Sequence, residues 1–108
     1  MLYEYRLYHA FPGRLPDLER RFTDHTLRLF ERHAITSIGF WTCYIGASSN
    51  TLHYILAWPD LATRQQRWDA FASDPDWLAA KAESEANGPL VDHVTNEFWK
   101  PTSYSPLR

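Results

Sequence analysis

Three residues near the N-terminus have the types and the spacing for chemistry. Glu4, Arg6 and Tyr8 alternate along a stretch rich in Tyr and Leu, so in a strand their side chains share one face. A carboxylate and a guanidinium at this spacing either pair with each other, which fixes the register of the sheet, or bind a ligand. In the second case Arg6 holds a carboxylate, phenolate or enolate. Tyr8 and Trp41 then supply aromatic walls.

Two histidines are further candidates for the same pocket. His25 and His33 lie eight residues apart in a predicted helix, which separates them by about 12 Å, too far to share a metal without other ligands. Each either packs at the rim of the core, the commoner role, or exchanges a proton with a ligand. The sequence has no metal-ligand motif and no Gly-rich phosphate loop, and Cys43 has no paired base. We therefore expect no metal and no cofactor.

Hydrophobic periodicity and turn residues predict the elements that must position these side chains. The predicted order is strand, helix, strand, strand, helix, short extra helix and strand. The ranges are strand 2–9, helix 15–33, strand 35–45, hairpin loop 47–50, strand 51–58, a helix opened by Pro59-Asp60, a short helix opened by Asp74-Pro75, and strand 90–99. This order predicts an α+β fold of the ferredoxin-like βαββαβ type. We expect a single domain over residues 1–108, of which 101–108 form an extended tail.

The helices of such a fold cover only one face of the sheet. We assign Glu4, Arg6, Tyr8, Trp41 and Tyr54 to the uncovered face, because a helix-packed core does not readily take both a carboxylate and a guanidinium. A face with so many rings is too apolar to leave in water. The simplest solution is a homodimer in which two such faces form a barrel around a pocket.

On the helix side, charge and aromatic pattern suggest ordinary structural roles. Arg64 and Arg67 are predicted to lie on a solvated helix face. Trp68, Phe71 and Trp77 are predicted to lie in the core.

Composition excludes several classes of protein. The net charge is −2 without a basic run, so nucleic-acid binding is not expected. No apolar run reaches the roughly 18 residues of a membrane span, and we expect no membrane insertion. A single cysteine suits a reducing cytoplasm. Aromatic residues make up 16% of the chain, more ring area than one small core needs, so some rings should line a cavity or meet a partner.

Several segments together resemble the NIPSNAP family. They are YEYRLYHAFPG near the N-terminus, ERHAITSIGFWT, DPDW at 74–77, GPLV at 88–91 and the closing PTSYSP. Their order and spacing cover about residues 3–106. The sequence departs from the family at Ala34, where many members have Gly, and at Tyr54, where many have a polar His.

The resemblance implies a dimeric α/β barrel and leaves two hypotheses about function. The first is a soluble homodimer of uncharacterised molecular function, with a barrel pocket for a small apolar or aromatic molecule. The alternative is an enzyme like the cofactor-independent monooxygenases or isomerases, which acts in that pocket. The pocket candidates are Glu4, Arg6, Tyr8, Trp41, Tyr54, His25 and His33.

Overall fold

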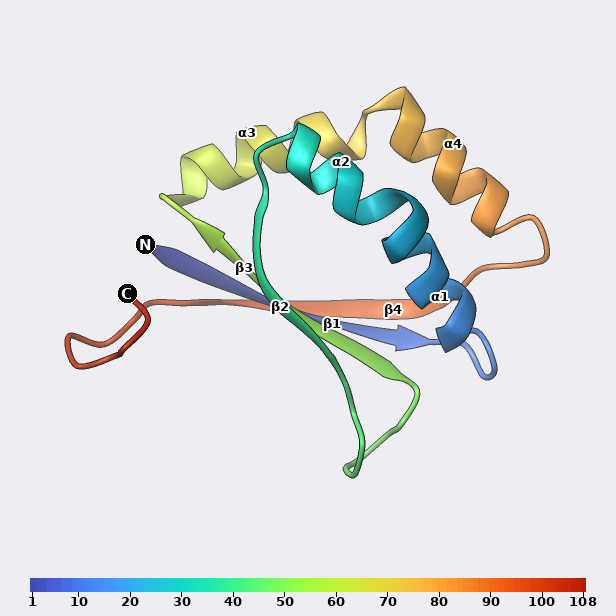
Figure 1. Cartoon of the computed structure of the whole chain (residues 1–108), viewed down its shortest axis with the longest axis horizontal. Helices are drawn as coiled ribbons and strands as arrows, with labels where there is room; N and C mark the ends of the chain where they lie inside the picture. Colours follow the sequence, from blue (N-terminus) through green and yellow to red (C-terminus); the bar gives the residue numbers. More distant parts are fainter.

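Four strands form one antiparallel sheet in the computed structural model, which describes all of residues 1–108, and the helices lie together on one side of it (Figure 1). The strands are β1 (Leu2–Ala10), β2 (Thr36–Thr42), β3 (Thr51–Trp58) and β4 (Val91–Trp99). The helices are α1 (Leu15–Arg21), the π-helix η1 (Phe22–Thr26), α2 (Leu27–Arg32), α3 (Leu61–Ala72) and α4 (Pro75–Ser84).

The sheet has the order β2-β3-β1-β4, and every neighbouring pair is antiparallel. Because β3 lies between β1 and β2, and β1 between β3 and β4, each helical segment connects strands that are not neighbours. This is the ferredoxin-like α+β topology, and the prediction of fold class from the order of elements is confirmed. The second strand is shorter than predicted, since β2 ends at Thr42.

Two aspartates start the helices of the second half. Asp60 accepts a hydrogen bond from the backbone N–H of Thr63 at 2.7 Å and caps α3. Asp74 does the same for α4, accepting from the backbone N–H of Asp76 at 2.9 Å. Pro75 follows in the first turn, where its missing N–H has no cost. Asp74 also accepts a hydrogen bond from Arg32 at the end of α2, so this cap joins two helices.

The elements α1, η1 and α2 follow one another without a break, and the turn in the middle is wider than an α-helical turn. Residues Phe22–Thr26 form a π-helix between α1 and α2, and the backbone N–H of Leu27 donates to the carbonyl of Phe22, five residues back. Such turns are rare and often lie at functional sites. The apolar pattern predicts a helix over this whole range but gives no signal for the wider turn.

The predicted assignment of strand faces is wrong for four of its five residues. Glu4, Arg6, Tyr8 and Tyr54 point toward the helices and are buried there, and Tyr54 is fully buried. Only Trp41 lies on the uncovered face, since it is paired with His53 while Tyr54 is paired with Phe40. The charged pair can enter the core because other core residues bond to it, as described below.

The uncovered face of the sheet carries the alternate set of side chains. Tyr5 stacks on Trp99 there, with ring centroids 5.1 Å apart, and its hydroxyl bonds Nδ1 of His53 at 2.6 Å. Trp41 and Trp99 remain about half exposed. The chain after β4 turns back without helix or strand, and Leu107 lies beside Tyr3 around one hollow of this face.

At the end of α2, one residue has a strained backbone conformation that a substitution can test. Ala34 has a φ of 56°, and the N–H groups of Ala34 and Ile35 donate to the carbonyls of Glu31 and Phe30 at 3.1 and 2.9 Å. This is the helix-ending motif in which glycine is preferred, because a Cβ is strained in the left-handed conformation. Ala34→Gly should raise the free energy of unfolding by about 0.5–1 kcal/mol, less than the full strain because glycine gains freedom in the unfolded chain.

Thermal unfolding of the Ala34→Gly variant should therefore show a higher midpoint. The matched control is Ala70→Gly, an exposed alanine inside α3, which should lose about 1 kcal/mol. A lower midpoint for both variants would show that the left-handed conformation at Ala34 is not strained.

None of the helices is both long and apolar enough to cross a membrane.

Candidate functional site

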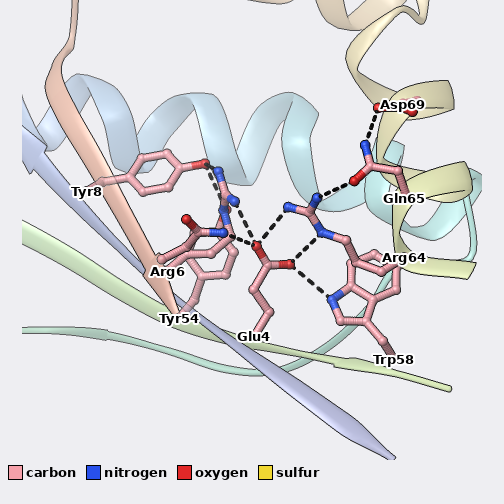
Figure 2. Close-up of polar contacts among 9 residues, drawn as sticks. Glu4, Arg6, Tyr8, Tyr54, Trp58, Arg64, Gln65 and Asp69 are labelled. Carbon is pink, nitrogen blue, oxygen red and sulfur yellow. Dashed lines mark hydrogen bonds and ion pairs between the residues drawn. The ribbon is translucent and has the colours of Figure 1, made fainter. Parts of the chain in front are cut away.

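A buried carboxylate lies at the centre of the helix-facing side of the sheet. Glu4 has no exposed surface and accepts five hydrogen bonds from four side chains (Figure 2). Arg64 donates from Nε and Nη2 at 3.1 and 2.9 Å, Arg6 from Nη1 at 3.0 Å, Trp58 from Nε1 at 3.1 Å and Asn96 from Nδ2 at 2.8 Å. These donors replace the water that the carboxylate loses.

Arg6 lies between this carboxylate and two phenol groups. Its Nε donates to the hydroxyl of Tyr54 at 2.9 Å and its Nη2 to that of Tyr8 at 3.4 Å, while the two hydroxyls bond each other at 2.8 Å (Figure 2). The indole of Trp68 covers the guanidinium, with 4.3 Å between Cζ and the ring centroid. Each nitrogen of Arg6 is therefore already a donor to Tyr54, Glu4 or Tyr8.

The protonation states follow from burial and from these partners. Burial of the carboxyl would raise the pKa of Glu4, but the hydrogen bonds from Arg64, Asn96 and Arg6 outweigh it, so the pKa lies below its ordinary value. Burial opposes the charge of Arg6 too, yet the neighbouring Tyr54 holds its pKa above the ordinary value. Burial raises the pKa of Tyr54 itself well above its usual range. At neutral pH Glu4 is therefore a carboxylate, Arg6 a guanidinium ion and Tyr54 a neutral phenol.

The position of Arg64 contradicts a second prediction, that this residue lies on a solvated helix face. Its side chain is only 12% exposed, because it folds from α3 over the sheet to reach Glu4 and packs against the rings of Trp68 and Phe98. The polar sequence around it favours a solvated helix face instead. The physical reason for the difference is the negative charge of Glu4 below α3, which no local pattern reveals.

A cavity of about 280 Å³ lies between the sheet and the helices, beside this cluster. Arg6 and Tyr8 form part of its floor, together with Val91 and Val94 of β4. Five aromatic rings from the helices also line it: Phe22, Phe30, Trp68, Phe71 and Trp77. The cavity therefore lies on the helix side of the sheet rather than on the uncovered face where the sequence predicts it.

Positive charge exceeds negative charge around the cavity. Arg6, Arg21 and Lys81 line it, against one carboxylate from Glu85. Both arginines lie against a tryptophan face, and Cζ of Arg21 is 5.1 Å from the ring centroid of Trp77. Aromatic walls with a few cationic groups suit a small molecule that has a ring system.

The structure separates the predicted site residues into groups. Arg6 and Tyr8 line the cavity, and Glu4 and Tyr54 lie next to them in the hydrogen-bond cluster. Trp41 is on the opposite face of the sheet, as described above.

Neither of the two histidines lines the cavity. His33 bonds the carboxylate of Asp74 through Nε2 at 2.7 Å and joins the end of α2 to the start of α4. Hydrogen bonding from His33 is the largest of the effects that lower the pKa of Asp74 to about 2. His25 lines a separate polar cleft beside α1 and α4.

The helix side of the cavity is the part that sequence reasoning misses. The sequence gives no signal for Arg21, Thr26 and Lys81, and it predicts that Trp68, Phe71 and Trp77 are core. That expectation is partly met, because Phe71 is buried and the two tryptophans pack against the core. The only available signal is the excess of aromatic residues, which predicts a cavity without giving its position.

No three of the His, Cys, Asp and Glu side chains come close enough to form a set of metal ligands.

The fold and the cluster define an α+β protein of the ferredoxin-like class with a charged network under its helices. Comparison with protein families matches residues 3–106 to the NIPSNAP model. The chain belongs to the NIPSNAP family, and the resemblance seen in the sequence is confirmed. No curated protein matches the chain.

Solved structures agree with this assignment. Protein Atu4242 from Agrobacterium tumefaciens is 27% identical, with a TM-score of 0.88 over the whole of both chains. The NIPSNAP family protein Atu5224 from the same organism is 22% identical, with a TM-score of 0.87 over 99% of this chain and 98% of its own. Atu4242 is itself of unknown function, so these relatives give the fold and family but not an activity.

A more distant structure shares the fold alone. It is a mutant of MhuD with two manganese protoporphyrin IX molecules bound per active site. It is 18% identical, with a TM-score of 0.64 over 94% of each chain.

Proposed function

We propose that this protein binds a small aromatic or apolar molecule in the cavity between its sheet and its helices, and that it works as a homodimer. The observation that carries the first part is the cavity itself, which has six aromatic rings and two arginines in its lining. Its volume is at the lower end of ordinary ligand sites, so the ligand is about the size of one or two fused rings. A single half-buried cysteine supports the cytoplasm as the place of action.

The uncovered face of the sheet supports the second part. Trp41 and Trp99 leave about half of their surface in water there, and Tyr44 and Ile45 in the hairpin after β2 are almost fully exposed. A second copy of the same chain would remove these rings from water through one self-complementary contact. The tail lines one hollow of this face together with Tyr3, Ile55 and Trp99.

The alternative of a cofactor-independent monooxygenase or isomerase has one supporting feature. Arg6 and Tyr8 bring a cation and a hydroxyl to the cavity floor, where they would stabilise an enolate or phenolate of the bound molecule. Catalysis would require the same binding step, so turnover is to be measured on compounds that bind.

Titration of the protein with 2-naphthoate and 2-naphthamide, followed by tryptophan fluorescence and calorimetry, tests the binding function. At least one compound should bind at one site per chain and raise the thermal unfolding midpoint, because a ligand at 100 times its Kd stabilises by about 2.7 kcal/mol. Ala72→Phe should weaken binding at least tenfold, since Ala72 lines the cavity and the added ring would take up space that the ligand needs.

Ala79→Phe is the matched control, because Ala79 is an exposed helical alanine that does not line the cavity. It should bind as the unchanged protein does. If neither naphthalene compound binds, or if the two phenylalanine variants behave alike, the cavity is not the ligand site.

A further inference from the structure

Arg21 occupies an unusual position for a charged side chain. It is the last residue of α1, is only 5% exposed, and lines both the aromatic cavity and the polar cleft beside it. Its guanidinium lies over the ring of Trp77, which also lines the cavity. A cation that is nearly removed from water needs strong partners.

The protein supplies Arg21 with few of them. Its Nη1 reaches Ser84 and Glu85 at 3.4 Å each, which is long for a charged hydrogen bond. Its Nε is buried and has no hydrogen-bond partner at all. By contrast, all three side-chain nitrogens of Arg6 donate hydrogen bonds to other side chains of the protein. Arg14 has the only other buried side-chain nitrogen without a partner, and it lines the polar cleft but not the cavity.

The wider helical turn explains how Arg21 comes to face the cavity. Thr26, five residues later, also lines it, and the hydroxyl of Thr26 donates to the carbonyl of Arg21 at 3.4 Å. In an α-helix five residues make about 1.4 turns, so two such residues would face different sides. The π-helix η1 brings them to one side, and π turns are frequent at functional sites.

We propose that the ligand of this cavity is an aromatic or apolar acid and that Arg21 binds its carboxylate. The proposal rests on the proposed function and adds the ligand class and the residue that selects it. A carboxylate oxygen would give the free Nε an acceptor and would place the negative charge where the lining has an excess of cations. Lys81 adds a second positive charge, while Trp77 and Phe71 would contact the ring.

The comparison of 2-naphthoate with 2-naphthamide tests this proposal without any variant. The two compounds have the same ring system and nearly the same size, and at about pH 7.5 only the first is charged, as a carboxylic acid titrates near pH 4. The dissociation constant of the naphthoate should be at least about tenfold lower, because hydrogen bonds to charged groups are stronger than neutral ones. Equal affinities would overturn the ligand class while leaving the binding function intact. Binding of neither compound would instead reject the binding function.

Arg21→Gln tests the residue. The naphthoate preference should fall to about twofold or less, because glutamine keeps a donor but loses the charge. Arg20→Gln is the control: Arg20 precedes it on α1 and is exposed, pairs with Asp17, and does not line the cavity. Its preference should not change. A tenfold preference that persists in Arg21→Gln would overturn the role of Arg21.

Circular dichroism of each variant checks that the fold is intact. If Arg21→Gln does not fold, Arg21→Lys replaces it, since lysine keeps the charge but has no Nε–H in the guanidinium plane. The preference should then fall at least about threefold. An unchanged preference in Arg21→Lys would count against the proposal.

Discussion

Replacing Glu4 with glutamine should lower the free energy of unfolding by about 3–5 kcal/mol, the range found when one partner of a buried ion pair is removed. The substitution keeps the shape of the side chain but leaves Arg6 and Arg64 without a counter-ion under the helices. It also replaces one acceptor oxygen with an NH₂ group. This group faces the hydrogen-bond donors around Glu4 and cannot accept from them, so hydrogen bonds are lost as well. A loss of this size is a large part of the stability of an ordinary domain.

Thermal and urea unfolding measure this effect. The midpoint of Glu4→Gln should fall by more than about 10 °C. Glu31→Gln is the matched control, because Glu31 is an exposed glutamate on α2, and its midpoint should change by less than about 3 °C. Equal midpoints for the two variants would show that the buried network contributes nothing to stability.

The pH dependence of unfolding gives a second readout of the same change. The pKa of Glu4 is lower in the folded protein than its ordinary value of 4.5. Its contribution to stability is therefore complete above the pKa of the unfolded chain and is lost as the pH falls below that value. Other carboxylates also lose stability in acid, so the difference between the unchanged protein and Glu4→Gln is the useful quantity. That difference should shrink between about pH 5 and pH 3.

A single charge on the uncovered face should separate the proposed dimer. Leu7 lies in β1 at the middle of the sheet, next to His53 on one side and Thr95 on the other. In one protomer it points away from the helices, so Leu7→Asp leaves the core unchanged. In the dimer the carboxylate would be buried without a partner, which costs several kcal/mol. The dimer dissociation constant should rise at least about 100-fold.

Light scattering coupled to size-exclusion chromatography at about 20 µM measures the change. The unchanged protein should have twice the mass of the chain and Leu7→Asp the mass of one chain. Leu78→Asp is the control, because Leu78 is an exposed leucine on α4, and it should remain dimeric. A monomeric unchanged protein would remove the dimer from the proposed function, and a dimeric Leu7→Asp would place the interface elsewhere.

The sequence predicts the fold well because the signals for it are local. The Phe11-Pro12-Gly13 turn, the capping aspartates Asp60 and Asp74, and the polar hairpin after β2 each mark an element boundary within a few residues. The alternation along β1 also separates its residues correctly into two sets. These features depend on backbone conformation and capping, which neighbouring residues determine.

The candidate site is less predictable because its parts are distant in the sequence. Alternation cannot say which set of strand residues faces the helices, and the charges of Glu4 and Arg6 favour the wrong one. The residues that make burial possible, Arg64 and Asn96, come 60 and 92 positions after Glu4. The π-helical turn before Leu27 has no characteristic residue types. The sequence therefore does not predict that Arg21 and Thr26 face the cavity.

Because of the charged network of Figure 2, the sheet side and the helix side of the cavity differ in how freely their residues can be exchanged. Arg6 and Tyr8 belong both to the network and to the cavity floor, so we expect substitutions there to affect stability as well as the proposed binding. On the helix side, Ala72 and Lys81 line the cavity and are otherwise exposed to solvent. Under the proposed binding function, exchanges at these helix positions would change which compound is accepted while the strand layer below them stays constant.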